Sequence, residues 1–168
     1  IGLRIELVFV DDGSTDGSLE RLQKRRAADE RVRIISFRRN FGKSDALDAG
    51  FRAARGEVIF TMDADLQDNP QQIPDFLAQI DAGFDLVSGW KKVRHDPVVS
   101  KNLPSRLFNR VTSNVSGIRL HDFNCGYKCY RRETVDALHV YGELHRFLPA
   151  IAHMKGFRVC EIPVIHRA

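Results

Sequence analysis

Short apolar runs alternate with amphipathic segments along the first half of the chain. A short apolar run bounded by turn residues is typical of a buried strand, whereas leucines or small residues at helical spacing predict a helix. Repeated strand–helix units of this size predict an α/β fold, in which helices cover both faces of a mostly parallel central sheet. Strands are expected at residues 5–10, 32–37, 57–62 and 84–88, and helices at residues 18–28, 42–55 and 70–82.

The alternation breaks after Trp90. Residues 91–104 are polar and predict a loop, and residues 105–116 have the spacing of an amphipathic helix. With no repeat and no clear second domain, we expect one domain that spans residues 1–168. Its remaining elements are predicted as strands at 127–130 and 158–164 and a helix around 143–155.

Composition and charge add two constraints. At 43% hydrophobic and 29% charged residues, the 168-residue chain can bury a core, and it has no apolar run near the roughly 18 residues of a membrane-spanning helix. Its net charge of +4 hides a partition, because residues 1–90 carry a net −4 and residues 91–132 a net +8. This partition suggests a site that holds a cation on one side and phosphates on the other.

The three cysteines, Cys125, Cys129 and Cys160, are too few for a disulfide framework. The spacing of Cys125 and Cys129 could suggest a metal pair, but no His or Cys partner pair has zinc spacing. We therefore expect buried or inert thiols, which suits a reducing compartment.

Carboxylates follow two of the predicted strands, with Asp11 and Asp12 after the first and Asp63 and Asp65 after the third. Open α/β sheets bind ligands at the carboxyl ends of their strands, and Mg²⁺ commonly takes one or two carboxylates together with substrate phosphates. Aspartate is also common in such loops for structural reasons, but the two loops together favour a metal–diphosphate site. The absence of G-x-G-x-x-G and of a P-loop motif argues against a dinucleotide dehydrogenase and a P-loop NTPase.

Five ordered motifs carry a resemblance to a known family. Residues 10–16 (VDDGSTD), 39–43 (RNFGK) and 63–70 (DADLQDNP) resemble the signatures of family 2 glycosyltransferases. Residues 122–128 (DFNCGYK) and 145–149 (HRFLP) are similar to the subgroup that acts on polyprenyl phosphates. The resemblance covers essentially the whole chain. It implies a GT-A fold and an inverting enzyme of glycan biosynthesis that moves a hexose or related sugar from a nucleotide-diphospho-sugar to a polyprenyl phosphate.

The resemblance assigns donor-binding roles to residues of the first half. It implies that Asp12 contacts the base or ribose of a UDP- or GDP-linked donor and that Asp11 supports this contact. Lys43 is a further candidate donor contact, and a solvated lysine at a helix start is its alternative. Asp16 is expected to be a helix N-cap.

The Asp-Ala-Asp motif implies a metal ion in the site. Asp63 and Asp65 would meet the donor diphosphate through Mg²⁺ or Mn²⁺, and Gln67 is the candidate third ligand. Asp63, Asp65 and Asp122 are the candidate catalytic residues. Asp122 would orient the sugar or the acceptor or serve as a base, and a structural turn residue is its alternative. His145 is expected to be architectural.

A polyprenyl phosphate acceptor accounts for the basic block, because Lys and Arg bind phosphates at a membrane surface. The candidate acceptor-phosphate residues are Lys91, Lys101 and Arg106, with Arg131 and Arg94 as lesser candidates. For each of them alone, a solvated surface charge is the alternative. The expected partners are the nucleotide-sugar, the lipid phosphate and a membrane surface, without nucleic acid, and a homo-oligomer is left open.

The chain departs from the family in two respects. The family usually opens with a strand of the type V-V-I-P-V-Y-N-E, whereas this chain begins at what resembles the second strand. The subgroup also often carries transmembrane helices after the catalytic domain. We therefore expect a catalytic domain without its first strand and without a C-terminal membrane segment, from a parent protein on the cytoplasmic side of a membrane.

Three other functions remain open. A family 2 transferase that elongates a polysaccharide predicts a downstream acidic dyad or Gln-x-x-Arg-Trp run, and neither is present. A nucleotidyltransferase shares the fold type but needs a Gly-rich basic first loop, in a region this chain does not include. A non-catalytic basic membrane-binding or nucleic-acid-binding module predicts basic residues without ordered Asp motifs.

Overall fold

The computed structural model describes residues 4–91, 112–113 and 116–165. The chain divides into two units, of which the first comprises Ile1–Glu57 and His139–His145 and the second Val58–Leu138 and Arg146–Ala168. Each unit holds its own sheet. Within the described residues, no helix has the length and apolar character that crossing a bilayer requires.

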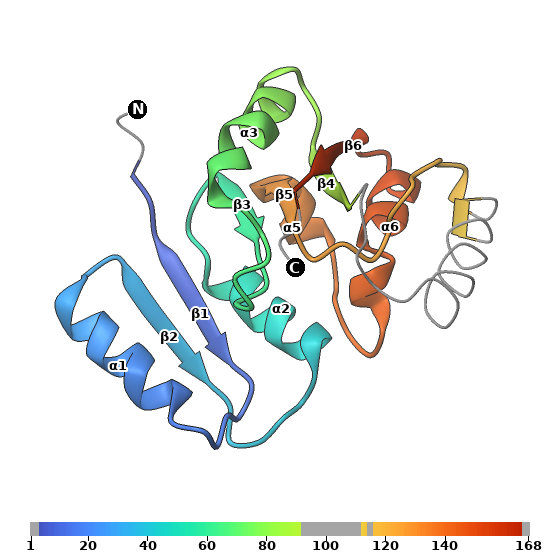
Figure 1. Cartoon of the computed structure of the whole chain (residues 1–168). Helices are drawn as coiled ribbons and strands as arrows, with labels where there is room; N and C mark the ends of the chain where they lie inside the picture. The colour runs from blue at the N-terminus through green and yellow to red at the C-terminus, as the bar shows by residue number, and fades with distance from the viewer. Residues whose placement is uncertain (1–3, 92–111, 114–115, 166–168) are drawn as a thin grey trace. The chain divides into compact units, whose positions relative to one another are not determined.

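Two parallel strands, β1 (Leu7–Asp11) and β2 (Val32–Ser36), form the sheet of the first unit. The intervening helix α1 (Ser18–Ala28) packs on β2, and α2 (Lys43–Ala53) packs on β1. Figure 1 shows α1 running alongside β2. Because the strands run in the same direction, their carboxyl ends lie at one edge of the sheet, as the strand–helix alternation predicts.

The second unit holds a four-stranded sheet in the order β3 (Val58–Thr61), β5 (Lys128–Arg131), β4 (Leu86–Lys91) and β6 (Val159–Val164). β4 and β6 are parallel, but β5 is antiparallel to both β3 and β4. The sheet is therefore mixed, whereas the alternation pattern predicted mostly parallel strands. β5 follows the strand–helix repeats in the sequence. It lies between β3 and β4, which run in the same direction but do not pair with each other.

Proline divides two of the predicted helices. The segment predicted as one helix at 70–82 is a 3₁₀ turn, η1 (Pro70–Gln72), followed by α3 (Ile73–Asp81). The segment at 143–155 likewise becomes η2 (Leu144–Arg146) and α6 (Leu148–Met154). Pro74 and Pro149 each stand in the first turn of the second helix, where the missing N–H costs no hydrogen bond. A shorter helix, α5 (Arg132–Ala137), follows β5, and most of the helix predicted at 105–116 lies outside the described residues.

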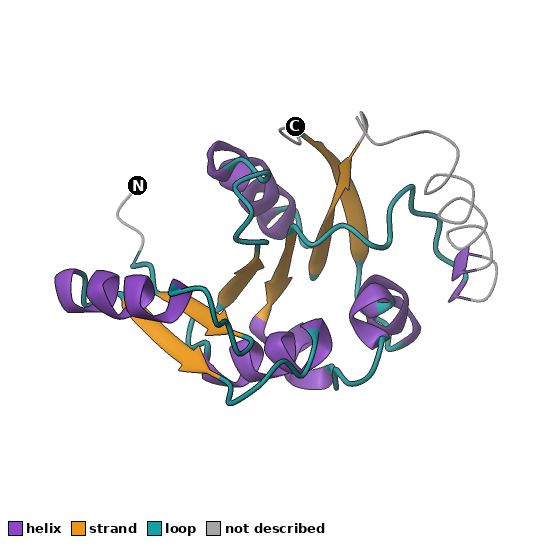
Figure 2. Cartoon of the chain, turned by 60° about the horizontal axis from the view of Figure 1, so that its bottom comes forward, coloured by secondary structure: helices purple, strands orange, loops and turns teal. Residues whose placement is uncertain are grey.

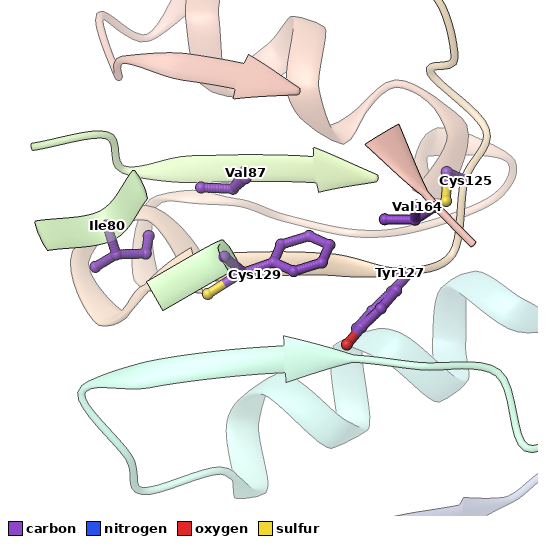
Figure 3. Close-up of a cluster of buried hydrophobic side chains, with 7 residues drawn as sticks. Ile80, Val87, Cys125, Tyr127, Cys129 and Val164 are labelled. Atoms are coloured by element: carbon purple, nitrogen blue, oxygen red, sulfur yellow. The ribbon is translucent and has the colours of Figure 1, made fainter. Parts of the chain in front are cut away.

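One face of the second sheet is covered by α3. A cluster of fully buried side chains joins helix and strands, and the ring of Phe76 lies 4.5 Å from that of Tyr127, centroid to centroid. Figure 3 shows this cluster, with the Tyr127 hydroxyl at its edge. Its buried members are Phe76, Ile80, Val87, Cys125, Tyr127, Cys129 and Val164.

The opposite face of this sheet is covered by α6 and by residues near Leu120 and Phe123. Ala150 of α6 packs with Leu120, Phe123 and Val159 in a separate buried cluster. Along β6, Cys160 faces α3 while its neighbour Val159 faces α6, as the period of a strand requires. Figure 2 shows helices on both sides of the strands, so the prediction that helices cover both faces is confirmed for this unit.

Candidate functional site

The carboxylate of Asp12 joins two of the sequence motifs in the first unit. Its two oxygens accept the backbone N–H groups of Phe41 at 2.7 Å and Gly42 at 2.9 Å. These bonds hold the R-N-F-G-K turn against the loop after β1 and place a negative charge at the start of α2, where the helix dipole favours it. Asp12 therefore organises the turn expected to face the donor, and its contact with a nucleotide stays a prediction.

Asp11 is buried and fastens its own loop. Its carboxylate accepts the N–H of Ser14 at 3.3 Å and the hydroxyl of Ser36 at 3.1 Å, which fits the supporting role predicted for it. Gly13 makes the close approach possible, because its φ is +74° and a Cβ there would lie 2.5 Å from the carbonyl carbon of Arg39. No other residue fits this turn without moving the backbone.

The prediction that Asp16 is the N-cap of α1 is wrong by one residue. Gly17, in the left-handed region, occupies that position, and Asp16 accepts the N–H of Ser18 at 3.1 Å from the residue before it. The hydrogen bonds that Ser18 donates lower the pKa of Asp16. The Asp16 carboxylate therefore still accepts a backbone N–H from the first turn of α1. The left-handed conformation of Gly17 brings that carboxylate back toward the helix.

Lys43 and His145 both belong to the first unit. Lys43 is the first residue of α2, directly after the turn that Asp12 holds. The next residue, Ser44, is buried, and its hydroxyl oxygen lies 2.9 Å from Nδ1 of His145. This bond ties the H-R-F-L-P motif to α2, in keeping with the architectural role expected of His145.

The predicted metal ligands gather in one tight loop of the second unit. We call residues 63–69 the acidic loop. It follows β3, and Leu66 reverses the chain with a φ of 64°. Asp65 is exposed, and its carboxylate accepts the N–H of Gln67 at 3.0 Å. Asp63, Asp65 and Gln67 therefore lie in one loop at the carboxyl end of β3, and their role as metal ligands stays a prediction.

A third carboxylate of the acidic loop, Asp68, was not predicted as a site residue. It is 6% exposed, and burial raises its pKa. The charge of Lys91 and the N–H of Asp63 oppose that shift, while the negative charges of Asp63 and Asp65 add to it. Asp68 belongs to the D-A-D-L-Q-D-N-P motif, but its burial could not be predicted from the sequence. It shows that Lys91, at the end of β4, lies within electrostatic reach of the acidic loop.

The segment 125–128, which leads into β5, lines the same edge of the sheet. A Cβ on Gly126 would lie 2.6 Å from Oδ2 of Asp63, so the Asp63 carboxylate rests against the Gly126 backbone. Thr61 donates its hydroxyl to the carbonyl of Gly126 at 2.8 Å. Lys128 is buried and donates from Nζ to the carbonyl of Cys125. Gly126 and Lys128 belong to the motif at residues 122–128, but the sequence does not reveal that this motif contacts the acidic loop.

Asp122 is buried to 1% exposure and its Oδ1 accepts the N–H of Asn124 at 3.1 Å. The preceding residue, His121, is tied down by its N–H bonds to Glu161 and by its ring, which stacks on Trp90 with centroids 4.0 Å apart. Asp122 thus shapes the turn that opens its motif, which agrees with the structural alternative. Its part in catalysis stays a prediction.

The structure separates the basic candidates. Lys91 lies at the carboxyl edge with the acidic loop, but Arg131 lies opposite Val58, at the beginning of β3. Its guanidinium donates to the carbonyls of Phe84, at 3.2 Å, and Ile80 instead of facing that edge. The structure therefore does not bring Arg131 to the predicted site. The other candidates, Lys101, Arg106 and Arg94, lie outside the described residues.

The donor set of the acidic loop suits a hard divalent cation. Asp63, Asp65 and Gln67 offer oxygen ligands, which Mg²⁺ and Mn²⁺ prefer over the softer ligands that select zinc. Across residues 4–91, 112–113 and 116–165, no three His, Cys, Asp or Glu side chains form a group that could hold a metal ion. Two carboxylates completed by substrate phosphates are nevertheless the usual pattern for Mg²⁺.

Solved structures define the class of fold. The mannosyltransferase from Pyrobaculum calidifontis, solved with GDP-Man and Mn²⁺, matches 94% of this chain and 45% of its own with a TM-score of 0.65 at 21% identity. Glucosyl-3-phosphoglycerate synthase from Mycobacterium tuberculosis, solved with Mn²⁺, UDP-glucose and phosphoglyceric acid, matches 97% of this chain and 61% of its own with a TM-score of 0.67 at 18% identity. The chain therefore has the GT-A fold of glycosyltransferases.

Sequence comparison gives the family. The model of glycosyl transferase family 2 matches residues 1–138, and the chain belongs to that family. Dodecaprenyl-phosphate galacturonate synthase of Rhizobium johnstonii is 38% identical over 169 residues, covering 98% of this chain and 50% of the relative. Undecaprenyl-phosphate 4-deoxy-4-formamido-L-arabinose transferase of Pseudomonas aeruginosa is 38% identical over 170 residues, covering 99% and 49%. The chain thus spans about half the length of these curated relatives.

Proposed function

We propose that this chain carries the catalytic site of an inverting glycosyltransferase that moves a hexose or related sugar from a nucleotide-diphospho-sugar to a polyprenyl phosphate. The observation that carries the proposal is the acidic loop, held at the carboxyl ends of β3 and β4 with Lys91 in electrostatic reach. Opposite charges at this edge suit a cation and a phosphate together. Both relatives are named for a polyprenyl phosphate, which supports the acceptor class.

The donor is a UDP- or GDP-linked sugar, with Asp63, Asp65 and Gln67 as the residues that would hold Mg²⁺ or Mn²⁺ and the Asp12 turn as the nucleotide contact. When bound, the ion neutralises charge on the leaving diphosphate. Two solved neighbours carry Mn²⁺ and a nucleotide-sugar, which supports this choice of donor and metal. Lys43 is proposed as a further donor contact.

The reaction is a single displacement. A phosphate oxygen of the lipid forms a bond to the anomeric carbon, while the bond from that carbon to the diphosphate breaks and its electron pair stays on the departing nucleoside diphosphate. A phosphate monoester is already anionic near neutral pH, so no strong general base is required. Asp122, buried and capping its own turn, accordingly orients the site instead of removing a proton.

The acceptor phosphate is bound by Lys91, together with Lys101 and Arg106, and a lipid acceptor requires the parent protein to work at a membrane surface, for which we propose the cytoplasmic side. Basic residues near such a surface attract anionic headgroups at about 1 kcal/mol each. Basic residues of the net +8 segment 91–132 other than Arg131 and the buried Lys128 are proposed to supply this attraction.

The test offers a panel of UDP- and GDP-sugars and undecaprenyl and dolichyl phosphates to membranes from cells that express the natural gene, with lipid mass spectrometry as the readout. We expect a glycosylated lipid with Mg²⁺ or Mn²⁺, its loss by at least 100-fold in Asp63→Asn, and normal transfer in Asp81→Asn, an exposed carboxylate at the end of α3. Transfer to a glycan and to no lipid would identify a polysaccharide-elongating enzyme. Vesicle binding without any transfer would identify a membrane-binding module.

A further inference from the structure

We propose that Gly126 and Tyr127 position the acidic loop, and that the absence of a side chain at Gly126 determines where the Asp63 carboxylate lies. The proposal rests on the proposed function for its chemistry, since it treats Asp63 as the ligand of the donor's metal ion. Gly126 itself touches no substrate and acts through Asp63.

The atoms nearest to the side-chain position of Gly126 belong to Asp63. A Cβ added at this glycine would lie 2.6 Å from Oδ2, 3.0 Å from Oδ1 and 3.0 Å from Cγ of Asp63, and these are its three nearest atoms. All three belong to one carboxylate, so a methyl group here would clash first with that group. No left-handed φ accounts for the glycine at this position, which leaves the close approach as its reason.

The acidic loop is flanked by one hydrogen bond to Gly126 and one from Tyr127. Two residues before the loop, at the end of β3, the hydroxyl of Thr61 donates to the carbonyl of Gly126 at 2.8 Å. At the end of the loop, the hydroxyl of Tyr127 donates to the carbonyl of Asn69 at 3.2 Å. The ring of Tyr127 is fully buried against Phe76, so this second anchor is part of the hydrophobic core.

A substitution at Gly126 should therefore change the position of the Asp63 carboxylate without lowering the stability of the protein. The clashing atoms sit at the end of a short side chain near the sheet edge, and the carboxylate can move away without opening the core. Relief of the clash requires a shift approaching 1 Å, a misplacement that costs about 100-fold where geometry determines the chemistry. A residue with a merely structural role would lower the melting temperature instead.

The experiment compares Gly126→Ala with Gly50→Ala. Gly50 lies within α2, and a Cβ there would make an ordinary 3.5 Å contact with Val10. We expect Gly126→Ala to raise by at least tenfold the Mn²⁺ concentration for half-saturation, measured by electron paramagnetic resonance of free Mn²⁺ with UDP or GDP present. Its melting temperature should stay near that of the wild type, and Gly50→Ala should bind Mn²⁺ normally.

Tyr127→Phe is the second variant, and it tests the positioning of the acidic loop on its own if Gly126→Ala does not fold. Losing one hydrogen bond at the far end of the loop should raise the half-saturating Mn²⁺ concentration by about three- to tenfold. Wild-type Mn²⁺ binding in both variants, or in Tyr127→Phe where Gly126→Ala is unfolded, would overturn the proposal and leave the proposed function standing. A wild-type protein that neither binds Mn²⁺ with a nucleotide nor transfers a sugar would overturn the proposed function itself.

Discussion

Burial sets the reactivity of the three thiols. Burial raises the pKa of Cys129 to about 12 and that of the half-buried Cys160 to about 11, and it also raises the pKa of Cys125. Because the thiolate is the reactive form, N-ethylmaleimide at about pH 8 should modify the folded protein slowly, with Cys160 first. Mass spectrometry of timed samples measures this order. Rapid labelling of Cys129 in the folded protein would contradict it, and denaturation should make all three react alike.

Glu6 holds the first unit together and makes its stability depend on pH. Its carboxylate accepts Nη1 of Arg33 at 3.1 Å and the N–H groups of Arg55 and Gly56. Burial raises the pKa of Glu6, but the hydrogen bonds from Arg55, Arg33 and Gly56 outweigh it and leave the pKa lowered. The folded state therefore binds its proton more weakly than the unfolded chain does.

A lowered carboxyl pKa stabilises the fold above the unfolded pKa of about 4.3, and the contribution disappears as the pH falls through the folded pKa. We expect Glu6→Gln to lose about 1 kcal/mol at neutral pH and almost nothing at about pH 3. Urea unfolding at both pH values measures the difference. Glu30→Gln, an exposed carboxylate in the same unit, serves as the control and should change neither value. An equal loss at both pH values would show that the carboxylate charge is not the cause.

Arg131 connects α3 to β4. Its guanidinium donates to the carbonyls of Ile80 and Phe84 near the end of the helix and lies 3.6 Å from Asp85. Arg131→Met leaves helix-terminal carbonyls without their donor and should destabilise the protein by about 1–3 kcal/mol. Thermal unfolding measures the loss.

The matched control is Arg52→Met, because Arg52 is 78% exposed and pairs with Asp48 one helical turn earlier. Its loss should stay below about 0.5 kcal/mol. Since Arg131 lies away from the acidic loop, its replacement should leave the KM for the polyprenyl phosphate unchanged. A raised KM for that lipid would place Arg131 back among the acceptor-binding residues.

Elements with local signals could be predicted closely from the sequence. The helix expected at 18–28 is α1, residue for residue, and the strands around Val32 and Leu86 lie where apolar runs end in turn residues. The place of β5 could not be predicted, because strand pairing is non-local and no turn fixes its register. The register of β5 places Arg131 opposite Val58, at the end of the sheet away from the acidic loop. The sequence shows the positive charge of Arg131 but not this position.

The candidate site divides in the same way. That Asp63, Asp65 and Gln67 lie in one loop was predictable because they are neighbours in one motif, and their role as metal ligands stays a prediction. The partner of that loop was not predictable, since Gly126 meets Thr61 across 65 positions of the chain. A glycine carries no charge or periodicity that would mark it, and its close approach to Asp63 emerges only from the paired strands.

Each unit carries its own pair of joined motifs. In the first, Asp12 links the V-D-D-G-S-T-D loop to the R-N-F-G-K turn, and in the second, Gly126 links the D-F-N-C-G-Y-K segment to the acidic loop. In the first unit both segments follow the parallel strands β1 and β2, so strand direction places them at one carboxyl edge. In the second unit the acidic loop follows β3 and the other segment leads into the antiparallel strand β5, so both lie at the same end of that strand pair. Each pair is therefore fixed within its own unit, and the binding of a nucleotide by the first pair and of a diphosphate by the second stays a prediction.

The whole protein should respond to removal of its metal both in activity and in stability. Burial raises the pKa of Asp68, and the negative charges of Asp63 and Asp65 add to that shift, so a bound cation should relieve the repulsion among these carboxylates. Treatment with a chelator should abolish sugar transfer, and added Mn²⁺ or Mg²⁺ should restore it. With a nucleotide present, Mn²⁺ at about 100 times its dissociation constant should stabilise the fold by about 2.7 kcal/mol, seen as a higher melting temperature. Asp63→Asn should lose both responses while Asp81→Asn keeps them, because Asp63 belongs to the acidic loop proposed to hold the ion, whereas Asp81 ends α3. Undiminished transfer after chelation would mean that the acidic loop serves the donor through hydrogen bonds alone.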